Sequence, residues 1–443
     1  MQAARARGAT AEQLAEADVL LTATYVALAE DMLTGQIDPR KVSQAWHIDR
    51  EEVDVDSALV RTIRMEPLAR AIVQLRPHTE DYDALRAELR RYRELAIAGG
   101  WPKVPDGEKL RAGDTTTVAR LEPLLVRLKA ESLLVQDHGL ARIGDRAVYD
   151  SAIAGAVAEF QRRHSIGVDG ILGGETLQSL NLSASYRFGQ IAANLERHRW
   201  LPRTLGETYI FVNVPAFRLD VVEDGKQAMT MKVVVGSEYD DRSTPAFADS
   251  MTYLEVSPYW NVPKEIAEKE LWPKIQADPT YLSRNNYELV TERNGEQRIR
   301  QLPGERNALG NVKFMFPNSF NIYLHDTPED DLFEKDVRAF SHGCIRVERP
   351  VDLARWVLRD KPEWNDARMQ EAMSQTKPRA VGLDRKVPVY IVYFTTFMRD
   401  GRLHFGNDLY DRDGALVKAV FDALTPSEQV RREVGELREL AGL

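Results

Sequence analysis

The chain has a single cysteine, Cys344, among its 443 residues. One cysteine excludes a disulfide within the chain, and it also excludes a zinc site built from several thiolates. A lone cysteine is either a small buried apolar side chain or a reactive thiol, and its sequence neighbours decide between the two. The residues around Cys344 are therefore the first place to look for chemistry.

The sequence also lacks long apolar runs and an excess of positive charge. No stretch of about eighteen consecutive apolar residues is present, so no segment is expected to span a membrane. The net charge of −9 provides no basic surface for nucleic acid, and no nucleic-acid partner is expected. The first residues, Met1 to Arg5, lack the apolar segment of a signal peptide, which indicates a cytoplasmic protein or a mature or trimmed chain.

The composition is that of a soluble globular protein, with 43% hydrophobic and 29% charged residues. A chain of 443 residues is longer than the chains that usually fold around a single hydrophobic core, so we expect two or three domains. Residues 10–100 carry apolar side chains at three- and four-residue spacing, which predicts a helical scaffold. The glycine- and proline-rich segment 98–107 marks a boundary, and a second helical stretch follows over residues 116–181.

The second half of the chain changes from a helical to an alternating pattern. Alternation of β-branched and aromatic residues predicts strands, with helices packed on them. The expected strands lie at 209–214, 217–222, 229–235, 251–256 and 387–397, and a helix is expected at 350–358. Residues 258–307 interrupt this pattern with an irregular, helix-containing stretch. A connection of that length within a compact domain is usually functional, which favours a lid over disorder.

The residues before Cys344 have the composition of a reactive site. His325 ends an apolar run that is typical of a strand, and Cys344 follows the turn Ser341-His342-Gly343. A thiol attacks as a thiolate, so a nearby imidazole that takes its proton makes it a nucleophile. Glycine before the nucleophile lets the N–H groups of Gly343 and Cys344 turn toward a substrate carbonyl as an oxyanion hole.

This pattern resembles the signature of the YkuD-type L,D-transpeptidases. The signature is a histidine, a gap, and Ser-His-Gly-Cys followed by an apolar residue and arginine; here fifteen residues separate His325 from Ser341. The resemblance implies that Cys344 is the nucleophile and His325 the base. It also implies that Tyr323 offers a substrate-side hydroxyl, that His342 has an orienting role, and that Ser341 and Arg346 shape the pocket. Arg346 either holds a substrate carboxylate or orients the loop.

A second resemblance lies upstream, where a set of residues is similar to the three-helix peptidoglycan-binding module. These residues are Phe160, Gln161, His164, Gly167, Asp169, Gly170, Gly173, Thr176, Leu180 and Asn181. The order of the whole chain resembles the large YcbB-like members of the transpeptidase family. The implied fold class is α+β multidomain, with a helical scaffold, the binding module, and a mainly-β catalytic domain interrupted by a capping subdomain. The expected bounds are 1–113 for the scaffold, completed by 182–206; 114–181 for the module; 207–410 for the catalytic domain with its cap at about 258–307; and 411–443 for a C-terminal helical tail.

The resemblance implies a two-step acyl transfer that forms 3→3 cross-links in peptidoglycan. Peptidoglycan stem peptides are then the substrates, and carbapenem-type β-lactams are covalent inhibitors. No cofactor and no metal are expected. The substrate implies export to the periplasm or cell envelope, and any membrane anchor would lie outside this chain. Three alternatives stay open at this stage: an L,D-carboxypeptidase, attachment of the wall to a protein amine, and a wall-binding scaffold with an inert cysteine.

Several site residues have a structural alternative. His325 is alternatively a satisfied core histidine, His342 a structural residue of the loop, and Tyr323 a packing residue of its strand. Trp260 and Asn261 are either substrate contacts or core and turn residues. Three further histidines are expected to be ordinary surface or helix residues: His138, His164 and His198.

Overall fold

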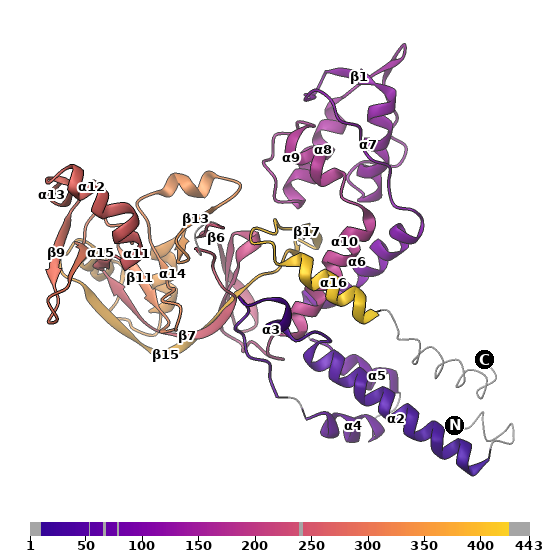
Figure 1. The fold of residues 1–443 in the computed structure, drawn as a ribbon, viewed down its shortest axis with the longest axis horizontal. Coiled ribbons are helices and arrows are strands. Elements are labelled where there is room, and N and C mark those ends of the chain that lie inside the picture. Colours follow the sequence, from indigo (N-terminus) through magenta and orange to yellow (C-terminus); the bar gives the residue numbers. More distant parts are fainter. Residues whose placement is uncertain (1–9, 53, 65–67, 78, 239–241, 425–443) are drawn as a thin grey trace. The chain divides into compact units, whose positions relative to one another are not determined.

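The protein is described here by a computed structural model that covers residues 10–52, 54–64, 68–77, 79–238 and 242–424 (Figure 1). The chain forms two compact units. Unit 1 contains Met1–Thr204 and Phe394–Leu443, and unit 2 contains Leu205–Tyr393. Among the described residues, every helix is too short or too polar to cross a bilayer.

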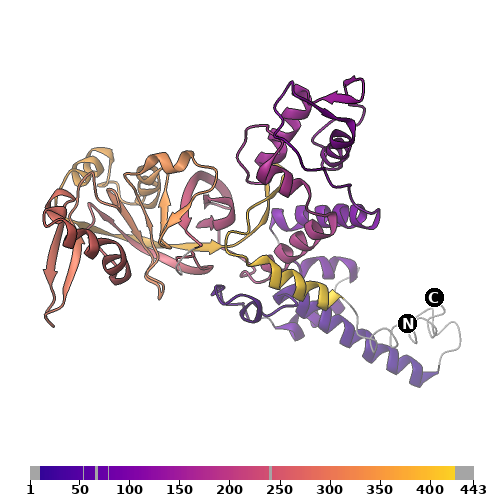
Figure 2. The same ribbon diagram turned by 45° about the horizontal axis from the view of Figure 1, so that its top comes forward.

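Unit 1 is built mainly from helices, coloured indigo to magenta in Figure 2, with α16 in yellow. Its helices are α2 (Ala11–Thr34), α3 (Pro39–Val42), α4 (Val55–Arg64), α5 (Leu68–Gln74), α6 (Glu80–Ile97), α10 (Ala184–Arg199) and α16 (Asp413–Leu424). Thr10 starts α2 with a capping box, because its side chain accepts from the Gln13 N–H and the Gln13 side chain accepts from the Thr10 N–H. Helices α6 and α10 pack against each other along their lengths.

The core of this helical part includes two strands from the C-terminal end of the chain. Strands β16 (Thr396–Arg399) and β17 (Arg402–Phe405) form a hairpin, and Leu403 and Phe405 are buried with Tyr82, Tyr92 and Ile191. The predicted catalytic domain ran to residue 410, but this apolar contact assigns residues 394–410 to unit 1. The predicted C-terminal tail is helical over α16, and its residues 425–443 lie outside the described part of the chain.

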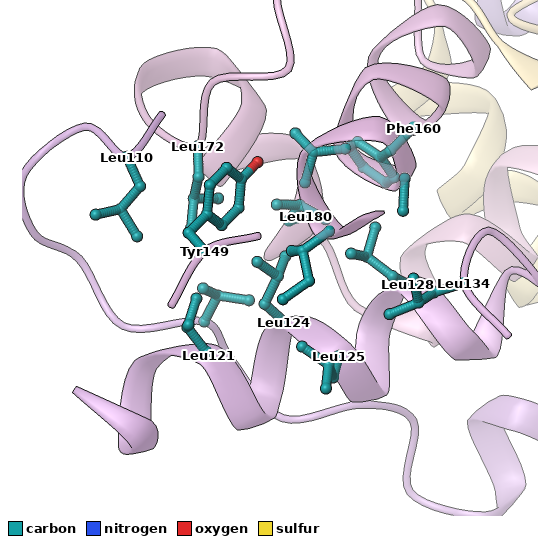
Figure 3. Close-up of a cluster of buried hydrophobic side chains, with 14 of the residues drawn as sticks. Leu110, Leu121, Leu124, Leu125, Leu128, Leu134, Tyr149, Phe160, Leu172 and Leu180 are labelled. Carbon is teal, nitrogen blue, oxygen red and sulfur yellow. The ribbon is translucent and has the colours of Figure 1, made fainter. Parts of the chain in front are cut away.

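A small module within unit 1 has three helices, as predicted, and also a three-stranded sheet that the sequence pattern did not indicate. Its elements are β1 (Thr115–Thr117), α7 (Val118–Ala130), β2 (Arg142–Ile143), β3 (Arg146–Val148), α8 (Ser151–Arg163) and α9 (Gly174–Leu180). Figure 3 shows Leu121, Leu124 and Leu128 of α7 facing Phe160 and Leu180 in its core.

The side chain of Gln161 connects several of the residues by which this module resembles the peptidoglycan-binding module. Its side-chain oxygen accepts from the N–H groups of Asp169 and Gly170, at 3.0 and 2.8 Å. Its amide nitrogen donates to Asp169 Oδ1 at 2.7 Å and to Thr176 Oγ1 at 3.0 Å. The motif therefore holds the glycine-rich turn against α8 and α9, a structural role that does not require these residues to touch a ligand.

A buried charge cluster joins the module to the helices around it. Arg127 and Glu131, both buried on α7 and at its C-terminal end, form an ion pair of 2.7 Å. The Tyr92 hydroxyl of α6 donates to Glu131 at 2.8 Å, and the Arg127 guanidinium lies 3.8 Å from the centre of the Trp101 ring. His164 is also buried here, with its Nε2 3.6 Å from Glu131. It is therefore a core residue rather than a surface one.

Replacing Glu131 by glutamine is expected to destabilise unit 1 by about 3–5 kcal/mol, because it leaves the Arg127 charge buried without a counter-ion. Hydrogen exchange of amides in α7 and α8 measures this loss locally. Glu122→Gln is the matched control, since it breaks an exposed pair with Arg142 and should cost less than about 1 kcal/mol. Equal, small effects of both substitutions would show that the buried cluster does not hold the module in place.

Unit 2 is a nine-stranded sheet with the order β13-β6-β14-β12-β11-β7-β15-β4-β5. The strands are β4 (Tyr209–Asn213), β5 (Arg218–Glu223), β6 (Lys226–Gly236), β7 (Phe247–Val256), β11 (Val312–Met315), β12 (Leu324–His325), β13 (Ala339–Ser341), β14 (Ile345–Val347) and β15 (Arg379–Val392). Strand β5 also pairs with β6, which closes the sheet on itself and leaves β13 outside the ring. Helices α14 (Pro350–Val357) and α15 (Asp366–Met373) complete the unit. The predicted combination of a helical part and a mainly-β part is thus confirmed.

The segment between β7 and β11 forms a subdomain, here called the cap, and Figure 1 labels α11, α12, α13 and β9 together at one end of unit 2. Its elements are β8 (Trp260–Asn261), α11 (Lys264–Ile266), η2 (Ala267–Leu271), α12 (Trp272–Ala277), α13 (Tyr281–Arg284), β9 (Tyr287–Thr291) and β10 (Gln297–Gln301). The three strands pair in the order β8-β10-β9. Ile299 and Leu271 are buried in a core of its own, with Trp260 packed against it. The cap is therefore a folded element rather than a loose loop.

Candidate active site

The strand register brings the predicted site residues to one face of the sheet. Strands β12 and β14 are parallel neighbours, and they pair Leu324 with Ile345 and His325 with Arg346. Successive residues of a strand point to opposite faces, and Leu324 and Ile345 are fully buried on one of them. The opposite face carries four predicted site residues: Tyr323, His325, Cys344 and Arg346.

The loop before Cys344 is held by its own serine. The Ser341 hydroxyl donates to the Cys344 carbonyl at 2.5 Å and accepts from the Gly343 N–H at 3.1 Å. Gly343 has a φ of +110°, a conformation that favours glycine. The Gly343 N–H is bonded to Ser341 in this state, so its predicted role as an oxyanion donor stays a prediction. The role of Gly343 in this arrangement is to allow the turn, whereas Ser341 fixes the turn's shape.

Thr244 is a residue of this site that the sequence pattern did not reveal. It is fully buried; its hydroxyl donates to the Gly343 carbonyl at 2.9 Å and accepts from the Gly236 N–H at 3.0 Å. In a planar trans peptide, the N–H of one residue points opposite to the preceding C=O. By binding the Gly343 carbonyl, Thr244 therefore makes the Cys344 N–H point to the side of the peptide that faces away from Thr244. Within the described residues this N–H has no hydrogen-bond partner.

The Cys344 thiol is partly covered and is bonded to residues that directly precede β12. Its sulfur lies 3.6 Å from the Asn321 carbonyl, and the main chain and hydroxyl of Tyr323 are hydrogen-bonded to it. Burial raises the pKa of the Cys344 thiol, and the hydrogen bonds from Tyr323 oppose this effect only in part. The thiol is thus protonated near neutral pH, contrary to the expectation that a partner imidazole lowers its pKa.

His325 has the properties of a neutral base. Only 4% of the residue is exposed, and its Nδ1 lies 2.5 Å from the Asp326 carbonyl, to which it donates. This bond leaves the Nε2 lone pair free for a proton. Burial, followed by the charge of Arg346, lowers the pKa of His325 to about 3. The described partners of the Cys344 thiol are Asn321 and Tyr323, so the expected His325–Cys344 hydrogen bond is not formed in this state.

Lys313 is the second residue that the sequence pattern missed. Strand β11 places it opposite His325 on one side and Glu255 on the other, and its Nζ lies 3.9 Å from the centre of the Tyr323 ring. Burial lowers the pKa of Lys313, and the Glu255 carboxylate acts in the opposite direction. A cation on this face favours the thiolate form of Cys344 when the proton is removed.

The cap contacts the nucleophile loop through Glu270 of η2. Its carboxylate lies 2.7 Å from His342 Nε2 and 3.0 Å from Arg242 Nη2. Burial raises the pKa of Glu270, but the hydrogen bond and charge of His342, together with Arg242, outweigh burial and lower it. His342 therefore bonds to the cap, which is compatible with an orienting role for the loop but not with direct contact to the thiol in this state.

A cavity lies where the cap faces the end of β12. Its volume is about 240 Å³, and its walls include Tyr287 and Arg306 of the cap and Thr327 and Arg346 beside β12 and β14. Trp260 does not line this cavity; it packs on the cap core with its ring centre 6.3 Å from that of Tyr287. Asn261 is exposed on β8, paired with Arg300. Substrate contacts of Trp260 and Asn261 stay predictions.

Three segments of the chain match known protein families. Residues 207–391 match the L,D-transpeptidase catalytic domain, YkuD; residues 1–89 match a scaffold domain; and residues 136–180 match the "Putative peptidoglycan binding domain". The fold and these matches thus describe a multidomain protein with a mainly-β domain. Residues 207–391 are similar to the YkuD family of L,D-transpeptidase catalytic domains, and the chain combines this segment with a match to a peptidoglycan-binding domain, as predicted.

Individual proteins that this chain is similar to are named as L,D-transpeptidases. A "Putative L,D-transpeptidase" of Haemophilus influenzae is 32% identical over 240 residues, which are 51% of this chain and 48% of the relative, so the match spans about half of that protein. Among solved structures, an L,D-transpeptidase from Mycobacterium smegmatis is 15% identical, with coverage of 42% and 58% and a TM-score of 0.22. L,D-transpeptidase 3 from Mycobacterium tuberculosis is 12% identical, with coverage of 42% and 61% and a TM-score of 0.23. TM-scores this low add no weight to the assignment, which rests on the family matches.

Removing the Thr244 hydroxyl tests whether the loop geometry matters. Thr244→Val keeps the shape of the side chain but loses both hydrogen bonds, so the Cys344 N–H is no longer aimed by the Gly343 peptide. We expect acylation of Cys344 to slow by about ten- to a hundredfold, the size of one lost oxyanion interaction or somewhat less, with unchanged KM. Thr244→Ser restores the hydroxyl and should recover most of the rate. Equal losses in both variants would assign Thr244 a packing role only.

Proposed function

We propose that the protein is a cysteine-dependent L,D-transpeptidase that forms 3→3 cross-links in peptidoglycan. The observation that carries this proposal is the shared face of β12 and β14, where Cys344, His325 and Tyr323 lie together and where the Cys344 N–H has no hydrogen-bond partner among the described residues. The substrates are stem peptides of the cell wall, and the site of action is the cell envelope. The peptidoglycan-binding domain would raise the local concentration of the catalytic domain on its polymer.

In the first step, the Cys344 sulfur attacks the carbonyl carbon of the L-centre at the third residue of a tetrapeptide stem. His325 Nε2 takes the thiol proton as the S–C bond forms, and the Cys344 N–H donates to the developing oxyanion. The C–N bond to the terminal D-Ala then breaks, and His325 returns the proton to the leaving amine. A thioester remains on Cys344. The neutral forms of both groups fit this general-base route, because the thiol proton leaves only when substrate is attacked.

In the second step, a side-chain amine from a neighbouring stem attacks the thioester. His325 accepts a proton from the amine, the C–S bond breaks, and the thiol of Cys344 is restored. Water in place of the amine would make the same protein an L,D-carboxypeptidase. The cap contacts His342, two residues before the nucleophile, and lines a cavity together with Arg346, two residues after it. A folded cover in this position favours the transferase, because it limits access of water.

The acceptor is identified by the products formed from purified disaccharide-tetrapeptide. The proposed transferase yields 3→3 linked dimers and free D-Ala, detected by mass spectrometry. A tripeptide product without dimers would identify a carboxypeptidase instead. A wall peptide attached to an added protein amine would identify an attachment enzyme, and the absence of all three products would leave only a binding scaffold.

A further inference from the structure

We propose that the cavity of about 240 Å³ between the cap and the end of β12 binds the terminal residue of the donor stem, the one that leaves, through its free carboxylate. This inference rests on the proposed function and adds a specificity site to it. The cavity would make the enzyme select donors whose last residue ends in a carboxylate rather than in an amide or in further polymer.

The direction of the leaving group follows from the positions of the nucleophile and the base. His325 lies two residues beyond Tyr323, the position opposite Cys344, in the direction in which both strands run. The leaving nitrogen must face His325, since this residue returns the proton to it. The atoms beyond that nitrogen are the α-carbon and carboxylate of the leaving residue. They therefore extend past His325 toward Arg346, which pairs with it and lines the cavity.

The cavity wall already holds a carboxylate. The Glu329 carboxylate bonds to Arg346 Nη1, and the Thr327 hydroxyl lies 3.4 Å from the same nitrogen. The side chain of Glu329 is 58% exposed, so it can move into solvent when another carboxylate arrives. Arg346 Nε is buried and makes no hydrogen bond within the described residues. Arg346 Nη1 is thus occupied by the Glu329 carboxylate, which a substrate carboxylate can replace, and Arg346 Nε is a donor that no described residue uses.

The size and the opposite wall of the cavity fit one small residue. A volume of about 240 Å³ is below the roughly 300–1,000 Å³ of drug-sized ligand pockets, so a whole stem peptide does not fit. Arg306 places a second guanidinium on the cap side, with one nitrogen held by the Arg284 carbonyl at 2.9 Å. Tyr281, Tyr287 and Ala308 supply apolar surface for a methyl side chain. An alanine-sized residue with a carboxylate satisfies both features.

The test compares two donors, a tetrapeptide stem with a C-terminal carboxylate and the same stem with a C-terminal carboxamide. Wild-type enzyme should acylate about ten- to a hundredfold more efficiently with the acid, the range of one charged hydrogen bond. Arg306→Gln should reduce this preference toward unity by slowing only the acid. Arg346→Gln should also reduce the acid-to-amide ratio, while the loss of its charge beside His325 changes the rate with both donors. Arg298→Gln, which breaks an exposed cap ion pair with Glu292, should keep the full preference.

Glu329→Gln should strengthen the preference for the acid donor, whereas Arg306→Gln and Arg346→Gln weaken it. Removal of the Glu329 carboxylate should lower KM for the acid donor several-fold and leave the amide donor unchanged, which a loss of structure would not produce. Wild-type enzyme that cross-links acid and amide donors equally well would overturn the inference and leave the proposed function intact. Wild-type enzyme that acylates with neither donor would overturn both.

Discussion

A Cys344→Ala variant is expected to form no acyl-enzyme with a tetrapeptide stem or with a carbapenem. Since Cys344 is the only cysteine, no other thiol in the chain can replace it. Loss of a covalent nucleophile costs on the order of 10⁴–10⁶ in turnover, and the residual rate reflects binding and polarisation alone. Intact-protein mass spectrometry measures the adduct, and muropeptide analysis measures the product.

Cys344→Ser is the companion variant for this prediction, because it keeps the size of the side chain. Ser341 bonds the main chain of residue 344 and not its side chain, so the loop should keep its shape in both variants. Unchanged melting temperatures would establish that the loss is chemical. An adduct on Cys344→Ala as abundant as that on wild type would place the acylated residue elsewhere and remove the nucleophile assignment.

A His325→Ala variant is expected to acylate about 10²–10⁴-fold more slowly, the usual contribution of a general base. The pH dependence adds a sharper expectation. The folded-state pKa of His325 is lowered to about 3, so its base form persists as the pH falls from 7 toward 4. Wild-type acylation should therefore show no acid limb near pH 6.5, where an ordinary histidine titrates.

His138→Ala is the control for this second prediction, because His138 pairs with Asp150 in unit 1 and takes no part in the site. It should leave acylation unchanged. Acylation by His325→Ala at the wild-type rate would move the base to another residue. An acid limb near pH 6.5 in wild type would show that His325 is not held neutral by burial as the structure indicates.

The chemical centre was predictable because its signal is local in the sequence. The Ser-His-Gly-Cys turn and the apolar run that ends at His325 define two strand ends, and the structure pairs these strands directly. The positive φ at Gly343 also follows from residue type. The predicted oxyanion role of its N–H stays a prediction, because in this structure that N–H donates to Ser341, two residues earlier.

The supporting residues were not predictable, since they depend on contacts between distant segments. Thr244 lies about a hundred residues before the loop that it holds, and no motif marks it. Lys313 reaches the site only through the register of β11 with β12. In the same way, the assignment of β16 and β17 to unit 1 depends on burial of Leu403 and Phe405 against helices from the first half of the chain.

The cap illustrates an intermediate case. Its length and position between strands predicted a functional insertion, but helical and strand signals in segments of two to six residues are too short to define a fold. The structure shows that β8, β9 and β10 pair and enclose a core around Ile299. Trp260, expected at either a substrate site or a core, contributes to that core. The cap's contact with His342, and the cavity that it lines together with Arg346, emerged only in three dimensions.

The most direct test of the central claim is rapid-quench mass spectrometry of wild-type enzyme mixed with disaccharide-tetrapeptide. The account predicts a transient adduct with the mass of a disaccharide-tripeptide acyl group, mapped to the peptide that contains Cys344, together with an equal amount of released D-Ala. Added acceptor amine should discharge the adduct into 3→3 dimers. Dimers that accumulate without any adduct, or an adduct mapped to a residue other than Cys344, would contradict the account.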